Sequence, residues 1–192
     1  LGDHPSPPHQ DRDADALSRL TGGMAPPYFP ITPGQLRGAW TFHDLDEGVL
    51  EVEGFRILVR EIPHKGGRTF GFRVEDGTGT LAYLSDHHPV QLGPGPDGFG
   101  PYHPAAMELT RDVDVLLHDA QYTPEEFAAR ADFGHSTIGY AVGLGATAGV
   151  GQVLLYHHDP ARTDDELDAI LAGLAGAPVP VDVCLLYTSD AA

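Results

Sequence analysis

The fold class is decided by residues 113–126, which read Val-Asp-Val-Leu-Leu-His-Asp-Ala-Gln-Tyr-Thr-Pro-Glu-Glu. The first five residues are a short apolar run typical of a buried strand, which is expected to end at His118-Asp119. The last four predict the start of a helix, with Thr123 at the cap, proline at the first position and glutamate at the third. A strand that passes directly into a helix indicates the α/β class.

The same alternation continues on both sides of this stretch. Toward the carboxyl end, helices are expected over residues 136–148 and from Thr163 to about residue 172. Further strands are expected at residues 49–59 (a pair with a turn at Glu53-Gly54), 69–75, 80–84 and 153–156. Strands in hairpins followed by strands alternating with helices predict an α/β sandwich with mixed sheets.

The two ends of the chain differ from this pattern. The first forty or so residues are rich in proline and glycine, and they predict only one short helix, around residues 13–20. Residues 184–192 read Cys-Leu-Leu-Tyr-Thr-Ser-Asp-Ala-Ala, which resembles the translation of a sequencing adapter. We therefore expect one partial domain over residues 1–183 and a non-native tail over residues 184–192, with a real strand over residues 181–187 as the alternative.

Composition excludes several classes of partner. The chain has 11 Lys+Arg against 28 Asp+Glu, a net charge of −17, which disfavours non-specific binding to nucleic acid or to anionic membranes. A small anionic substrate stays open because bound cations reverse the local field. A single cysteine rules out a disulfide framework. We expect a cytoplasmic protein without a membrane span, acting on a small molecule, with a homodimer left open.

Histidines and aspartates gather where strands end and helices begin. The five phrases are Pro63-His64, Ser85-Asp86, His118-Asp119, residues 134–137 (Gly-His-Ser-Thr) and residues 156–159 (Tyr-His-His-Asp). Such positions concentrate ligands and catalytic groups, and imidazole with carboxylate suits borderline divalent metals. Each phrase also has an ordinary explanation, such as a turn for Asp86 or a helix cap beside His135. His87 and His88, which follow Asp86, are expected in an exposed turn.

Taken in order, these phrases resemble the second half of the metallo-β-lactamase superfamily, in its ribonuclease Z and cyclic-phosphodiesterase-like branch. Pro63-His64 precedes a Gly-aromatic-Arg strand at residues 71–73, and Asp86 ends the next strand. The His-acid-Ala and His-Ser-Thr phrases and the final strand-ending His157 follow in the same order. The resemblance spans about residues 24–180 and implies an αββα sandwich, incomplete at the amino terminus because the family's His-x-His-x-Asp-His phrase has no counterpart here.

The resemblance also implies roles for five residues. His64 would bind a first metal ion, Asp86 would bridge two, and His157 would bind the second. Asp119 and His135 would form a proton-handling pair. Two divalent ions, expected to be zinc with manganese or iron as alternatives, would share a hydroxide that attacks the substrate.

A metal-dependent hydrolase of phosphodiesters is therefore the leading hypothesis. The alternatives are a carboxylic ester, thioester or lactone hydrolase on the same scaffold, and a non-catalytic binding domain of the same fold. Because four of the seven family ligands are missing from these 192 residues, the chain alone is expected to bind metal weakly and to hydrolyse nothing efficiently.

Overall fold

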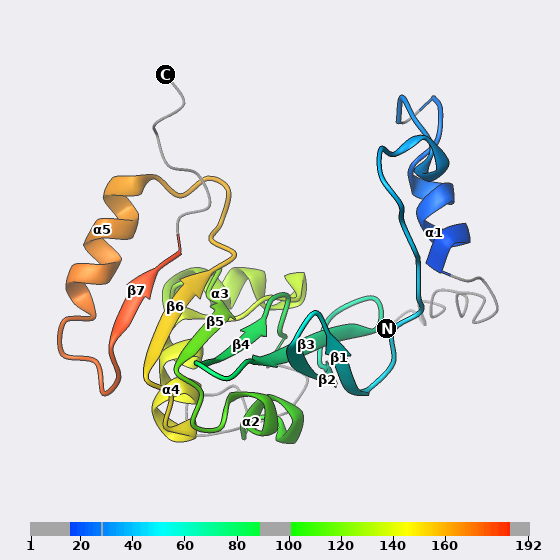
Figure 1. Ribbon diagram of the computed structural model, residues 1–192. Coiled ribbons are helices and arrows are strands. Elements are labelled where there is room, and N and C mark those ends of the chain that lie inside the picture. The colour runs from blue at the N-terminus through cyan, green and yellow to red at the C-terminus, as the bar shows by residue number, and fades with distance from the viewer. Residues whose placement is uncertain (1–15, 28, 89–100, 185–192) are drawn as a thin grey trace, which may run out of the picture. The chain divides into compact units, whose positions relative to one another are not determined.

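The structure is a computed structural model that describes residues 16–27, 29–88 and 101–184 (Figure 1). Backbone contacts divide the chain into two compact units, residues 1–46 and 47–192. The described part of the first unit contains a helix, α1 (Ala16–Gly23), and a 3-10 turn, η1 (Pro33–Gln35). The helix predicted at residues 13–20 thus extends three residues further, and residues 13–15 lie outside the described part.

The second unit is built on a seven-stranded mixed sheet whose strands follow their order in the sequence, from β1 to β7. The strands are β1 (Gly48–Val52), β2 (Phe55–Ile62), β3 (Thr69–Glu75), β4 (Thr80–Leu84), β5 (Val115–Asp119), β6 (Gln152–Tyr156) and β7 (Val181–Val183). Strands β1 to β4 form three antiparallel pairs in sequence order, and β4 to β7 pair parallel. The predicted α/β class and mixed sheet are confirmed.

Helices follow the strands of the parallel half (Figure 1). They are α2 (Pro104–Thr110), α3 (Pro124–Arg130), the 3-10 turn η3 (Ala131–Phe133), α4 (Ile138–Ala148) and α5 (Asp164–Gly173). Helix α2 packs against β2, β3 and β4, whereas α4 packs against β5 and β6. Within the described residues, no helix is both long and apolar enough to cross a membrane.

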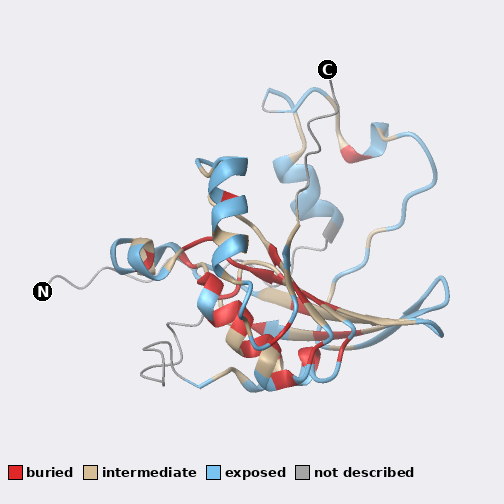
Figure 2. Cartoon of the chain, turned by 90° about the vertical axis from the view of Figure 1, so that its left-hand side faces the viewer, coloured by how far each residue is buried: buried red, intermediate tan, exposed pale blue. Residues whose placement is uncertain are grey.

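The core lies between the sheet and helices α2 and α4, where Figure 2 shows buried residues on both layers. Alternate residues of the parallel strands face it, so that Leu116 of β5 and Val153 of β6 are fully buried. Helix α4 approaches the sheet closely because Gly145 has no side chain. A Cβ there would lie 2.4 Å from Val153 Cγ2, which explains the small residues of this helix.

Strand β5, helix α2 and strand β7 differ from the predictions. Strand β5 begins at Val115 rather than at residue 113, because Asp114 turns toward the start of β4 and accepts the N–H of Thr80 at 2.7 Å. Helix α2 was not predicted; His103 caps it and a proline occupies its first turn. The last strand, β7, ends at Val183, and residues 185–192 of the expected tail lie outside the described residues.

Candidate metal centre

The site lies at the carboxyl ends of the parallel strands. Leu84 of β4 pairs with His118 of β5, and Asp119 of β5 pairs with Tyr156 of β6. The residues that follow these pairs, Asp86 and His157, therefore reach the same edge of the sheet as Asp119. The parallel register thus explains why three phrases distant in the sequence meet.

Four side chains converge at this edge: Asp86, Asp119, His135 and His157. Each offers one ligand atom, and these atoms all lie within 4.8 Å of one another. The Nδ1 atom of His157 lies 3.3 Å from an oxygen of Asp86 and 3.3 Å from an oxygen of Asp119. The Nδ1 atom of His135 lies 2.8 Å from Asp119 Oδ2 and 3.7 Å from Asp86 Oδ1.

The donor set fits a divalent cation. Two imidazoles and two carboxylates are the ligands that zinc uses when thiolates are absent. Four ligands around one zinc ion, with bonds of about 2.0–2.1 Å, lie roughly 3.4 Å apart, and the separations given above bracket that value. The four residues, alone among the described His, Cys, Asp and Glu side chains, form such a group.

Two of these residues adopt strained backbone conformations. Asp86 has a φ of 54° and His157 a φ of 56°, in the left-handed region that side chains other than glycine seldom enter. Both residues follow directly after a strand and aim their side chains at the same cluster. Strain that persists at such positions is typical of functional sites, because it is retained where the side-chain direction matters.

Asp119 is the buried centre of the cluster, with a fully buried side chain. Burial alone would raise the pKa of its carboxyl group, but hydrogen bonds from His135 and His157 outweigh burial and lower it. Its other oxygen accepts the backbone N–H of Ser136 at 3.1 Å. The carboxylate is therefore ionised, and it fixes both imidazoles as well as the start of the segment that leads into α4.

His157 carries the complementary shift. Its hydrogen bond to Asp119 raises the pKa of the imidazole, partly offset by burial and assisted by the charge of Asp86. The ring also stacks beside Tyr156, with centroids 6.1 Å apart. The Nδ1 edge of the ring therefore faces both carboxylates, and a cation bound there would replace the Nδ1 proton.

His135 is delivered by a tight turn before α4. Thr137 caps the helix by accepting the N–H of Tyr140 at 3.1 Å, and Gly134 precedes the cap with a φ of 97°. A Cβ at Gly134 would lie 3.0 Å from His64 Cε1, so glycine is required there on two counts. The His135 ring lies 4.7 Å from the His157 ring, between centroids.

His64, the fifth residue singled out from the sequence, lies beside the cluster rather than within it. Its ring centroid is 5.7 Å from that of His135. Its Nδ1 lies 2.8 Å from the carbonyl oxygen of Gly134, which can only accept, so the ring donates there. That bond makes Nε2 the nitrogen with the lone pair in the neutral ring, as a metal ligand requires.

The sequence predicted that the two histidines after Asp86 lie in an exposed turn, and this prediction is wrong. His87 is fully buried and His88 is 7% exposed. The Nε2 atom of His87 lies 3.2 Å from the Tyr140 hydroxyl of α4, and its ring packs edge-on against buried His118. Burial lowers the pKa of both His87 and His118, so this pair is a neutral part of the core beneath the site.

Charged residues close the loop after β6; Asp159 stood in the last of the five phrases, whereas Arg130 and Arg162 belonged to no motif. Asp159 forms an ion pair with Arg130 of α3 and accepts the N–H of Ala161 at 2.9 Å. Arg162, whose side chain is 6% exposed, pairs with Glu126 at 2.6 Å and donates to the Gln121 carbonyl. For the two arginines the sequence offered only their positions, Arg130 at the end of α3 and Arg162 directly before the second capping box.

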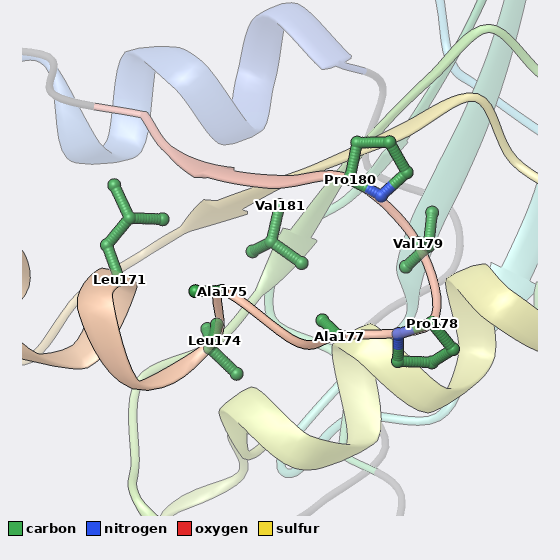
Figure 3. Close-up of a pocket in the computed structure, with 8 residues that line it drawn as sticks. All are labelled: Leu171, Leu174, Ala175, Ala177, Pro178, Val179, Pro180 and Val181. Carbon is green, nitrogen blue, oxygen red and sulfur yellow. The ribbon is translucent and has the colours of Figure 1, made fainter.

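A separate hollow carries no such chemistry. A groove of about 440 Å³ lies between the end of α5 and β7 (Figure 3). It is lined by Leu171, Leu174, Ala175 and residues 177–181, none of which has a side chain that ionises. This groove therefore offers no group for acid–base or metal chemistry.

Comparison with known proteins identifies the family. Residues 21–158 match the model of the beta-lactamase superfamily domain, which is more than half of the chain. The chain belongs to this superfamily. The expected membership, read first from the order of the His and Asp phrases, is confirmed.

Within this superfamily, the chain is similar to two curated relatives and to one solved structure. Ribonuclease Z of Methanosarcina mazei is 39% identical over 86 residues, covering 45% of this chain and 24% of the relative. Ribonuclease Z of Geobacillus kaustophilus is 26% identical over 166 residues, covering 66% and 53%. The metallo-β-lactamase fold protein YhfI of Bacillus subtilis has a TM-score of 0.56 at 18% identity, covering 76% of this chain and 55% of that one, and it supports the fold alone. The chain thus spans about half or less of the length of these relatives.

Proposed function

We propose that this superfamily member is a metal-dependent hydrolase of phosphodiesters, with a dinuclear metal centre. His64, Asp86 and His157 would be its metal ligands, and Asp119 and His135 its proton-handling pair. The observation that carries the proposal is the convergence of two carboxylates and two imidazoles at the carboxyl ends of β4, β5 and β6.

Bound divalent cations would supply Lewis-acid stabilisation and a water that ionises near neutral pH, and zinc suits the donor set best. The protein's own residues supply orientation. Asp119, ionised and buried, holds the His135 ring by its Nδ1–H, which directs the opposite nitrogen away from the carboxylate. A His135 ring protonated on both nitrogens can then pass the Nε2 proton to the leaving oxygen of the substrate, while Asp119 stabilises the positive ring.

A phosphodiester is favoured over a carboxylic ester by the relatives, which carry the name ribonuclease Z. An RNA substrate conflicts at first sight with a net charge of −17. The conflict is resolved if the substrate phosphate is recognised chiefly at the cation-bearing site, because bound cations reverse the local field there. Binding away from the site would then contribute little, and the affinity would depend only weakly on salt.

The test is a panel of bis(p-nitrophenyl) phosphate and p-nitrophenyl acetate, with zinc or manganese added or with EDTA. The 192-residue chain and the complete open reading frame that contains it are assayed in parallel. The proposal expects metal-dependent hydrolysis of the phosphodiester by the longer protein, removed by EDTA and restored by metal. Hydrolysis of the acetate alone would favour the ester alternative, and metal binding without turnover of either would favour a binding domain.

A further inference from the structure

His88 links three segments that carry candidate site residues. Its backbone N–H donates to the Pro63 carbonyl, the residue before His64, at 2.7 Å. Its Nε2 lies 2.9 Å from the carbonyl oxygen of Ala131, in the turn before His135. Two residues earlier, the same loop supplies Asp86.

The direction of the side-chain bond is unambiguous. A carbonyl oxygen only accepts, so His88 must carry its proton on Nε2 and donate it. With 7% of the residue exposed, little water can reach the ring to replace the bond, so losing the bond is costly.

The turn that His88 contacts needs such anchoring. None of the residues Ala131–Phe133 is buried, and Phe133 is 60% exposed, so apolar packing does not set the position of the turn. Side chains from the β2–β3 loop donate to two further carbonyls: His64 to Gly134 at 2.8 Å, and Lys65 to Asp132. Three donors from two loops thus hold three carbonyls of one short turn.

We infer that His88 is a positioning residue of the site, which fixes the turn before His135 relative to the loops that carry His64 and Asp86. It does not reach the cluster itself. It acts through the Ala131 carbonyl, and so sets the distance between the proton donor and the metal ligands. The catalytic role of His88 rests on the proposed function. Its role in fixing the position of the turn does not.

The experiment compares His88→Phe, which keeps a ring but has no donor, with His88→Gln, whose amide nitrogen reaches about as far as Nε2. Hydrogen exchange of the Ser136 amide, which donates to Asp119, is measured on the metal-free chain. We expect roughly tenfold faster exchange in His88→Phe and a rate within about threefold of the parent in His88→Gln. The Val153 amide, bonded to Pro180 across β6 and β7, should be unchanged in both.

His103→Phe is the matched control, because it removes the α2 cap without touching the turn. It should leave Ser136 exchange at the parental rate. If His88→Phe does not fold, His88→Asn replaces it, since its amide is too short to reach Ala131. Parental Ser136 exchange in the donor-free variant overturns the inference, and so does equal acceleration in the Gln and donor-free variants, because the bond would then not be the cause.

Kinetic measurements on the protein encoded by the complete open reading frame distinguish a failure of this inference from a failure of the proposed function. His88→Phe should lower kcat by about 10- to 100-fold with KM and metal content nearly unchanged, and His88→Gln should recover most of the loss. A parent without metal-dependent turnover defeats the proposed function, yet the exchange experiment still decides the position of the turn. An active parent with unaltered kcat in His88→Phe defeats the catalytic role of His88 alone.

Discussion

His135 and Asp119 face each other across the candidate site, with Nδ1 of the imidazole 2.8 Å from Oδ2 of a fully buried carboxylate. The two residues come from different elements, the turn before α4 and the end of β5. The same carboxylate also contacts His157, so one buried charge orients both histidines. This shared acceptor is the relationship on which the roles of the site depend.

His135→Ala tests whether that residue handles protons or binds metal. If it is the proton donor, the kcat of the protein encoded by the complete open reading frame should fall about 10²- to 10⁴-fold. Its metal content, measured by mass spectrometry, should stay at the parental value. Its Nδ1 lies near enough to Asp86 and Asp119 to ligate a cation as well. Loss of metal in step with activity would therefore contradict the proton-handling role.

Asp86→Ala should behave differently, because Asp86 is the proposed bridge between two ions. We expect loss of at least one bound metal ion per chain, measured by mass spectrometry after dialysis against zinc. Asp168→Ala, on the exposed surface of α5, is the control and should retain full metal content. A variant of Asp86 with parental metal content would remove this residue from the ligand set.

Gly134→Ala should destabilise the metal-free protein by about 1–3 kcal/mol, measured by urea unfolding. Alanine would have to adopt a φ of 97°, and its Cβ would lie 3.0 Å from both His64 and Lys65. Gly139→Ala is a matched control on α4, where a Cβ meets nothing within 4 Å. There the helix propensity of alanine should leave stability unchanged or raise it by up to about 1 kcal/mol.

The contribution of His157 to the stability of the metal-free chain should fall as pH rises through the titration of its ring. Hydrogen bonding to Asp119 raises the pKa of His157 in the folded state. The folded protein then binds the proton more tightly than the unfolded chain does. Its contribution is fully present below the unfolded pKa of about 6.5 and is lost as pH rises through the folded value.

Urea unfolding of the parent and of His157→Gln at pH 6 and pH 8 measures that contribution. The stability of the parent relative to the variant should be smaller at pH 8 than at pH 6. Added zinc should reverse the trend, because protons compete with the cation for the ring and metal binding strengthens as pH rises. A parent and variant with parallel pH profiles in EDTA would contradict the coupling between His157 and Asp119.

Local patterns predicted most of the second unit. The hairpin of β3 and β4 was placed at its observed bounds, since Asp76-Gly77-Thr78-Gly79 leaves little freedom; Asp76 accepts the backbone N–H groups of Thr78 and Gly79. The capping boxes at Thr123 and Thr163 likewise marked α3 and α5. These signals are reliable because the hydrogen bonds that form such turns and caps join residues only a few positions apart.

What escaped prediction depends on contacts between distant segments. His87 and His88 follow a turn in the sequence, yet α4 and the loops at Pro63 and Ala131 enclose them. The order of phrases indicated that Asp86, Asp119, His135 and His157 belong together, but whether their atoms approach to 3 Å or 6 Å is set by register and by the turn before α4. The contribution of Lys65 was invisible for the same reason, because its acceptor is a backbone oxygen.

The left-handed backbone at Asp86 sets thermal stability against metal binding at this position. Glycine adopts a φ of 54° without strain, whereas a residue with a Cβ does so at a cost. Asp86→Gly should therefore unfold at a higher temperature than the parent in the absence of metal. A laboratory selection for thermal stability alone would enrich such replacements, and metal binding would be lost. Selection that alternates between thermal stability and metal retention would preserve the strained aspartate.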